Sequence, residues 1–165
     1  ITWSKTNEPN FDDLYRIYVS YVYNRGFTDS MDYDVFLQSY KDQDNLIFLL
    51  FEDCAFSVLE EVGNSLIAHQ FCWNYQNPKL YLGKYASYIE IEYAREKLYD
   101  AIYLGPSYES MSEYKASFSG FEWWTGREWS IDKNAYFELL KVDDEVRTID
   151  DLVSFYQPYF KSLNI

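Results

Sequence analysis

The chain contains little cysteine, histidine, proline or glycine. Its 165 residues include 2 cysteines, 1 histidine, 4 prolines and 6 glycines. So few glycines and prolines argue against a collagen-like or low-complexity chain. A lone histidine and two cysteines far apart match no usual zinc pattern and no disulfide framework. We therefore expect no metal site, and we predict that Cys54 and Cys72 are buried thiols.

Long apolar runs are also missing. The longest candidate, residues 46–51, is far shorter than the ~20 residues that a membrane span needs, so we predict a buried strand there and no membrane contact. Residues 1–3 do not open a signal segment of basic and then apolar residues. These features favour a cytoplasmic protein, although an export signal removed before residue 1 would leave the same sequence.

Positive charge is scarce. The chain has 14 lysines and arginines against 27 aspartates and glutamates, which gives a formal net charge of −13. Such a surface repels phosphate backbones, so general nucleic-acid binding is disfavoured. The acidic residues are spread along the chain, and this favours a solvated acidic surface.

Aromatic residues, by contrast, are abundant. They make up 21% of the chain, and tyrosine alone occurs 18 times. Tyrosine suits half-buried positions, because the ring packs while the hydroxyl stays wet. With 48% hydrophobic residues and the length of one ordinary domain, residues 1–165 are predicted to form a single domain. The sequence leaves the oligomeric state open.

Apolar spacing and turn residues predict the order of helices and strands. We expect strands at 1–4, 46–52, 54–62, 65–75, 101–104 and 134–142, a strand or loop at 121–129, and helices at 11–26, 32–41, 85–98, 107–116 and 149–161. Antiparallel strands that lead into a parallel β-α-β crossover indicate an α+β fold with a mixed, mostly antiparallel sheet and flanking helices. Ligands of such sheets tend to bind where neighbouring strands part.

Four short motifs support a family resemblance. Residues 82–86 read Leu-Gly-Lys-Tyr-Ala and lead to Glu-Ile-Glu-Tyr-Ala at 90–94; Tyr-Leu-Gly follows at 103–105, Tyr-Lys-Ala-Ser-Phe at 114–118 and Gly-Arg-Glu-Trp at 126–129. In this order they resemble the C-terminal catalytic domain of arginyl- and leucyl-tRNA–protein transferases. Together with the element order, they are similar to the N-acyltransferase superfamily called GNAT, and the resemblance implies a GNAT-like fold.

The resemblance implies an N-acyltransferase. Such an enzyme moves an acyl or aminoacyl group from a CoA thioester (acyl-CoA) or an aminoacyl-tRNA to an amine, which is a small molecule or a peptide N-terminus. The donor-binding candidates are Tyr75, Leu82, Gly83, Lys84, Tyr85, Ala86 and Lys115. A tight turn into a helix leaves amide N–H groups that hold phosphate, and Lys84 adds a cation. The alternative is an ordinary strand-to-helix turn with a solvated lysine.

Three residues are candidates for proton transfer. Tyr114 matches the family tyrosine that protonates the leaving group, although most of the 18 tyrosines must be packing residues. Glu90 or His69 could accept the proton of the amine. The favoured alternative for Glu90 is a place on the protein surface. The favoured alternative for His69 is a structural hydrogen bond.

A non-enzymatic interpretation also stays open. The superfamily's acetyl-CoA loop carries glutamine or arginine at its first position and glycine or alanine at its last, where this chain has Leu80 and Tyr85. The same fold with a decayed donor site would serve as a catalytically inactive binding or interaction module.

Overall fold

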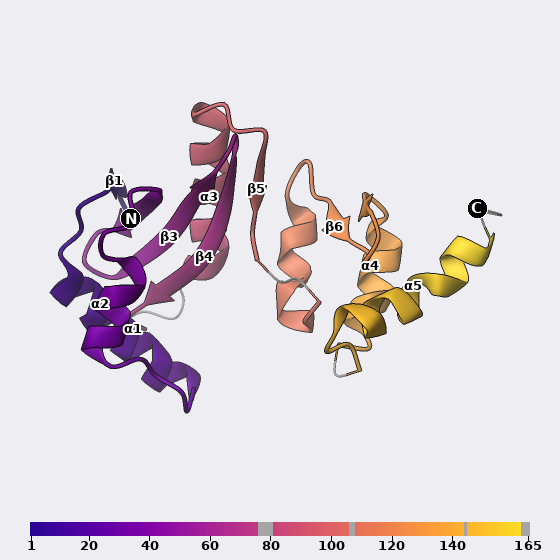
Figure 1. Ribbon diagram of the computed structural model, residues 1–165, viewed down its shortest axis with the longest axis horizontal. Helices are drawn as coiled ribbons and strands as arrows, with labels where there is room; N and C mark the ends of the chain where they lie inside the picture. The colour runs from indigo at the N-terminus through magenta and orange to yellow at the C-terminus, as the bar shows by residue number, and fades with distance from the viewer. Residues whose placement is uncertain (76–80, 106–107, 144, 163–165) are drawn as a thin grey trace. The chain divides into compact units, whose positions relative to one another are not determined.

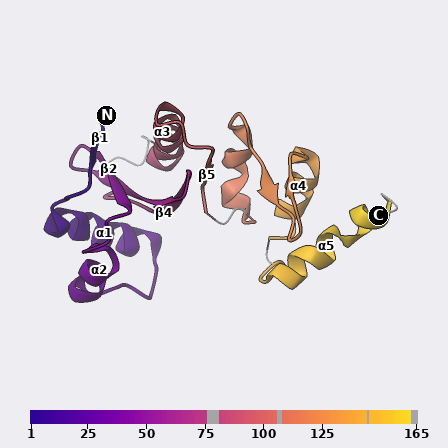
Figure 2. The same ribbon diagram turned by 45° about the horizontal axis from the view of Figure 1, so that its top comes forward.

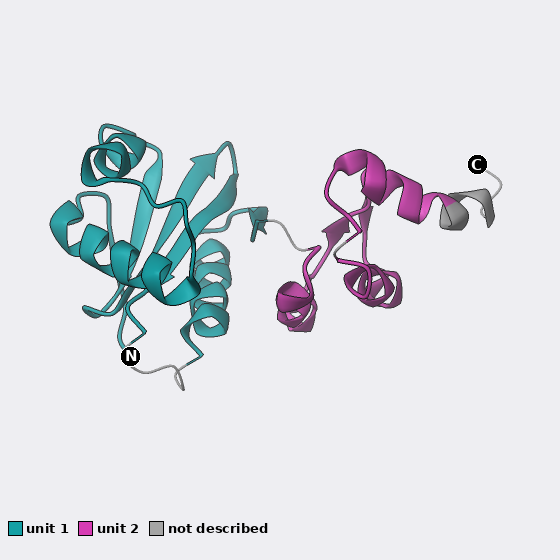
Figure 3. Ribbon diagram, turned by 90° about the horizontal axis from the view of Figure 1, so that it is seen from below, with its two compact units in different colours: residues 1–105 teal, residues 106–165 magenta. Residues whose placement is uncertain are grey.

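The computed structural model describes residues 1–75, 81–105, 108–143 and 145–162, with side chains up to residue 157. These residues divide into two compact units, Ile1–Gly105 and Pro106–Ile165 (Figure 3). The sequence predicts a single domain, whereas each of these units has its own core.

The first unit is built around a five-stranded mixed sheet (Figure 1). Its elements are β1 (Ser4–Thr6), α1 (Phe11–Arg25), α2 (Tyr33–Tyr40), β2 (Leu46–Phe51), β3 (Ala55–Val62), β4 (Ser65–Trp73), α3 (Leu82–Glu96) and β5 (Ala101–Tyr103). The strands lie in the order β1-β2-β3-β4-β5, and all neighbours are antiparallel except β4 and β5, which are parallel. The predicted α+β class and mostly antiparallel sheet are therefore confirmed.

Helices cover both faces of this sheet, with α3 on one side and α1 and α2 on the other (Figure 2). Because successive strand residues point to opposite faces, β2 supplies both cores. Leu49 and Phe51 pack with the α3 cluster, whereas Leu46 and Phe48 pack with the cluster of α1 and α2. Cys72 is buried in that second cluster, as predicted, and Cys54 is only partly buried.

The ends of α1 follow from its sequence. Asn10 caps the first turn by accepting a hydrogen bond from the amide of Asp12, and the helix ends at Gly26, whose φ of +69° is a left-handed conformation that suits glycine. Both ends agree with the predicted helix.

A β-bulge interrupts the pairing of β3 with β4. Val58 lies opposite Gln70 and Leu59 lies opposite Ala68, so His69 is the extra residue in β4. Within the described part of the chain, β4 pairs with β5 across Ser65–Ile67 only. Beyond the bulge, β4 therefore continues beside β3 while β5 has already ended.

The second unit is a small assembly of helices around a short hairpin. It contains the 3-10 helix η2 (Ser110–Ser117), β6 (Trp123–Trp124), β7 (Trp129–Ser130), α4 (Lys133–Leu140) and α5 (Ile149–Ser162). Its core holds Trp123, Tyr136, Leu139 and Leu152. A Cβ at Gly126, in the hairpin turn, would come within 2.5 Å of Val153 Cγ2, so the hairpin and α5 are closely packed.

One predicted strand in this unit is wrong. Residues 134–142 were expected to form a strand, but α4 occupies Lys133–Leu140. Asp132 starts this helix by accepting hydrogen bonds from the amides of Asn134 and Ala135. The buried residues then recur at helical spacing, since Ala135, Tyr136, Leu139 and Leu140 form one face.

None of the helices in the described ranges combines the length and the apolar character that a membrane crossing requires.

Candidate functional site

The start of α3 carries most of the predicted donor-binding residues. The amides of Leu82, Gly83 and Lys84 precede the first intrahelical hydrogen bond, which runs from the amide of Tyr85 to the carbonyl of Tyr81. No acidic residue lies in this first turn, and Lys84 is exposed. The turn therefore combines amides that have no partner within the helix with a cation, which is the chemistry that binds phosphate.

Buried side chains fix the position of this turn. Leu82 and Ala86 pack into the core beneath α3. A Cβ at Gly83 would meet no atom within 4 Å, so the space beside this glycine is open. The left-handed residue of the turn is Tyr81, with φ +48° and ψ +41°, rather than the glycine that the sequence singled out.

Tyr75 marks the other end of the crossover. Its ring stacks on Trp73 with 3.9 Å between the centroids, and its φ is +56°. Non-glycine residues in this conformation cost of order 1–3 kcal/mol and cluster at functional sites. Two of them, Tyr75 and Tyr81, flank residues 76–80, which lie outside the described residues and include Leu80.

Tyr85 is held by the protein itself. Its hydroxyl donates a hydrogen bond of 3.1 Å to the carbonyl of Ile1, and its ring packs edge-on against Phe51 at 6.1 Å. These contacts give Tyr85, a predicted donor-binding residue, a role in packing.

Glu90 lies under α3, so the expectation of a surface role is wrong. Glu90 is only 4% exposed, and its Oε1 accepts a 2.5 Å hydrogen bond from the hydroxyl of Ser57 on β3. Glu90 follows Ala86 by four residues and precedes Tyr93 by three, so it belongs to the buried stripe of the helix. Ser57, which the sequence reasoning missed, allows a carboxyl group to be accommodated there.

His69 forms a polar pair with Glu60. His69 Nε2 lies 2.5 Å from Glu60 Oε2, and Asn45 donates to Glu60 Oε1 at 2.8 Å. The hydrogen bond from His69, followed by that from Asn45, holds the pKa of Glu60 below its usual value. Because an ionised carboxylate only accepts, Nε2 donates the hydrogen bond to Glu60.

This pair lines a polar cavity of about 360 Å³ on the α2 side of the sheet. Tyr40 donates a hydrogen bond to Gln70 in the same cavity, and burial raises the pKa of Tyr40 to about 12. Ser57 and Glu90 belong to the opposite, α3 side, because Ser57 pairs with Leu49 of that core. His69 and Glu90 therefore do not share one site.

Tyr114 and Lys115 belong to η2 in the second unit. Tyr114 is half-buried, with its ring edge-on to Phe118 at 6.1 Å, and Lys115 is buried. It stays a prediction that Tyr114 and Lys115 act together with the candidate site residues of the first unit.

Glu60 and Asn45 are the site residues that sequence reasoning missed near His69. Glu60 was counted among the solvated acids. The hairpin turn at residues 63–64 could have revealed this neighbour, because it fixes the register of the two strands. In that register Glu60 lies opposite Ile67, two residues before His69.

Comparisons of the chain with models of protein families, with curated proteins and with solved structures give no match in any of the three.

Proposed function

We propose that this chain is an N-acyltransferase of the GNAT type, which moves an acyl or aminoacyl group from acyl-CoA or aminoacyl-tRNA to an amine. One observation carries the proposal. A bulged β4 continues beyond Ile67, where its pairing with the parallel strand β5 ends, and leads through the crossover into α3. Ligands of open sheets with a parallel crossover tend to bind beyond the carboxyl ends of the strands.

The part of β4 beyond the β5 pairing suits the donor. Residues 68–73 continue past the end of that pairing, and a strand edge can pair with extended chains that carry amide groups. The pantetheine arm of CoA is such a chain. Its phosphates, or those of a tRNA terminus, would bind the amides of the first turn of α3 and Lys84.

The chemistry needs two proton transfers. The amine nitrogen attacks the donor carbonyl, so a C–N bond forms and a C–S bond breaks, or a C–O bond when the donor is aminoacyl-tRNA. His69 Nδ1 takes the proton that the nitrogen loses, and Glu60 stabilises the resulting cation. The electron pair of the broken bond leaves on sulfur or oxygen, which takes a proton from the hydroxyl of Tyr114.

Donor binding is tested first. Thermal-shift and calorimetric titrations with acetyl-CoA, longer acyl-CoAs and aminoacyl-tRNA should show stabilisation by one of these donors. Lys84→Glu should weaken that binding, whereas Lys41→Glu, with the same charge change beyond α2, should not. Equal effects of the two variants would remove the start of α3 from the donor site.

Turnover is tested next, by mass spectrometry of the acylated amine. Tyr114→Phe and His69→Gln should each lower turnover by roughly 100-fold or more while the domain stays folded. Unchanged turnover in Tyr114→Phe with a genuine substrate would remove Tyr114 from the mechanism, and the same result in His69→Gln would remove the His69–Glu60 pair.

A second candidate function is a catalytically inactive binding module. The packing of Tyr85 against Phe51 and Ile1 favours it, because this side chain fills a position that the superfamily uses for its donor loop. The absence of stabilisation by every donor in the titrations above would support this candidate over the enzyme.

A further inference from the structure

Residues 1–3 are held by side chains from elsewhere in the first unit. The pairing of β1 with β2 begins only after them. Thr2 donates two hydrogen bonds to Glu52 Oε1, one of 2.9 Å from its amide and one of 3.3 Å from its hydroxyl. The carbonyl of Ile1 accepts a hydrogen bond of 3.1 Å from the hydroxyl of Tyr85, in the first turn of α3. The segment therefore joins the sheet to the start of this helix.

Trp3 attaches the same segment further along α3. Its ring lies edge-on to that of Tyr93, with 6.4 Å between the centroids, and it packs against the core cluster beneath the helix. Tyr93 follows Tyr85 by eight residues, which is about 12 Å along a helix. Contacts from one short segment thus span more than two turns of α3.

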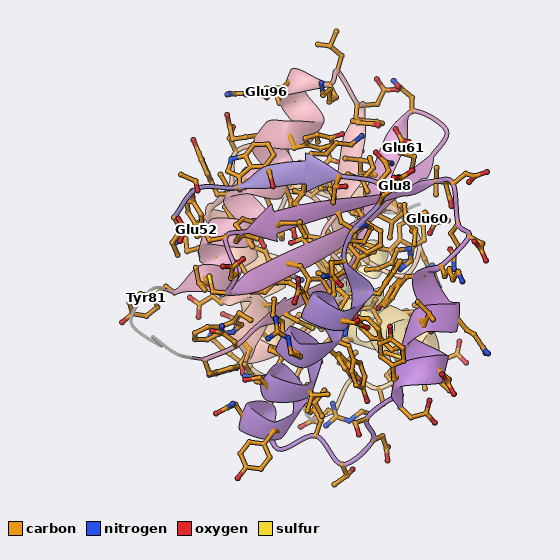
Figure 4. All side chains as sticks on the ribbon, turned by 90° about the vertical axis from the view of Figure 1, so that its left-hand side faces the viewer. Glu8, Glu52, Glu60, Glu61, Tyr81 and Glu96 are labelled. Atoms are coloured by element: carbon orange, nitrogen blue, oxygen red, sulfur yellow. The ribbon has the colours of Figure 1, made fainter. Side chains whose placement is uncertain are left out.

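Glu52 anchors the segment on the sheet. It lies in the turn between β2 and β3, and Figure 4 shows it at the same end of the strands as Tyr81, which precedes α3. The amide of Thr2 holds the pKa of Glu52 below its usual value, so the carboxylate is charged at neutral pH and both hydrogen bonds are charge-assisted. The anchor and the start of α3 therefore lie at one end of the sheet.

The backbone at Glu52 would suit another residue better. Its φ of +49° lies in the left-handed region, which glycine adopts without steric cost. Such strain persists only where the surrounding structure fixes it. The two hydrogen bonds from Thr2 engage the carboxylate, so glutamate at this position holds residues 1–3 although glycine would relax the turn.

The attachment of residues 1–3 is light enough to open. Ile1 is 43% exposed, Thr2 is exposed and Trp3 is half-buried. Segments with few buried apolar contacts and exposed hydrogen bonds open locally, without global unfolding. The ring of Tyr85 also packs on Phe51, so opening removes one contact of the helix start and leaves the other.

We propose that residues 1–3 form a strap that opens and closes as a unit and sets the order of the first turn of α3. With the strap closed, Tyr85 is fixed at both its ring and its hydroxyl, and the turn that carries Lys84 is held on the sheet. With the strap open, the hydroxyl loses its acceptor and the turn frays more often. The strap thereby regulates how far the donor-binding turn is preformed, a consequence that rests on the proposed function.

Hydrogen exchange of the whole chain tests the strap without any ligand. Tyr85→Phe removes the hydroxyl that holds Ile1 and keeps the ring on Phe51. Amides of residues 85–89 should then exchange roughly fivefold faster, because a hydrogen bond of ordinary strength is lost. The matched control Tyr88→Phe removes a hydroxyl from an exposed tyrosine of the same helix and should leave these rates unchanged. Equal rates in the two variants would overturn the proposal.

A second pair of variants separates the strap from global stability. Glu52→Gly removes the anchor and relaxes its turn, whereas Asp42→Gly relaxes a residue with φ of +63° away from the strap. Both should keep a urea midpoint near that of the wild type, yet only Glu52→Gly should speed exchange at residues 85–89. The same exchange in both variants, or acceleration that spreads through β3, would contradict a local strap. No donor is present in either experiment, so a failed strap and a failed acyl transfer are told apart.

Discussion

At the residue scale, the buried hydrogen bond between Ser57 and Glu90 is expected to contribute to the stability of the first unit. Ser57→Ala should lower the free energy of unfolding by about 1–3 kcal/mol, because it removes a donor from a buried carboxyl group. Glu90→Gln, which keeps an acceptor oxygen, should cost less. Urea denaturation measures both, and a Ser57→Ala variant as stable as the wild type would show that the contact contributes little.

The lowered pKa of Glu60 makes part of the stability depend on pH. A carboxyl group whose folded pKa is depressed stabilises the protein fully above its unfolded value, here 4.5, and this contribution disappears as the pH falls through the lower folded value. Glu60→Gln should therefore be less stable than the wild type at pH 7, and the difference should vanish at lower pH.

Urea midpoints between pH 7 and pH 3 measure this difference. Glu8→Gln, which removes another carboxylate of the first unit, is the control and should show no comparable trend. A difference between Glu60→Gln and the wild type that stays constant across the range would contradict the assigned hydrogen bonds.

The candidate site was only partly predictable from single residues. The sequence predicted α3 from its helical spacing, but the helix starts at Leu82 rather than at residue 85, and its left-handed turn residue is Tyr81 rather than a glycine. The partners of His69 and Glu90 come from β3, and such contacts depend on strand register and on a bulge that no local pattern announces.

At the scale of elements, α5 has a capping box that can be tested. The amide of Asp151 donates to Thr148 Oγ1 at 3.2 Å, and the amide of Thr148 donates to Asp151 Oδ2 at 2.8 Å. Thr148→Ala should destabilise the second unit by about 1 kcal/mol, whereas Thr148→Ser should retain the cap. Thermal unfolding followed by circular dichroism measures this, and equal effects of both variants would argue against the box.

The elements themselves were predictable where their pattern was long. The helix at 11–26, the three antiparallel strands and the closing helix were expected and are present. The strand expected at 134–142 failed because Asp132 supplies a helix cap and the buried residues follow a helical period, which a short apolar run does not distinguish from a strand.

The division into two units leads to a prediction for the whole molecule. Residues 1–105 contain the complete five-stranded sheet and two of the three core clusters, so this fragment should fold alone with a cooperative transition. If the proposed mechanism is right, the fragment binds the donor but has no turnover, because Tyr114 is absent. Denaturation, donor titration and product analysis of the fragment separate these outcomes, and a fragment that never folds would contradict the first.

The short pairing of β5 has a kinetic consequence. The β2-β3-β4 meander forms through chain neighbours, whereas β5 joins β4 across Ser65–Ile67 only after α3 has returned the chain to the sheet. We expect β5 to dock late in folding and to detach first under native conditions. Amide hydrogens of Ala101–Tyr103 should then exchange with solvent deuterium faster than those of β3, so the edge beside the proposed donor site would open without global unfolding.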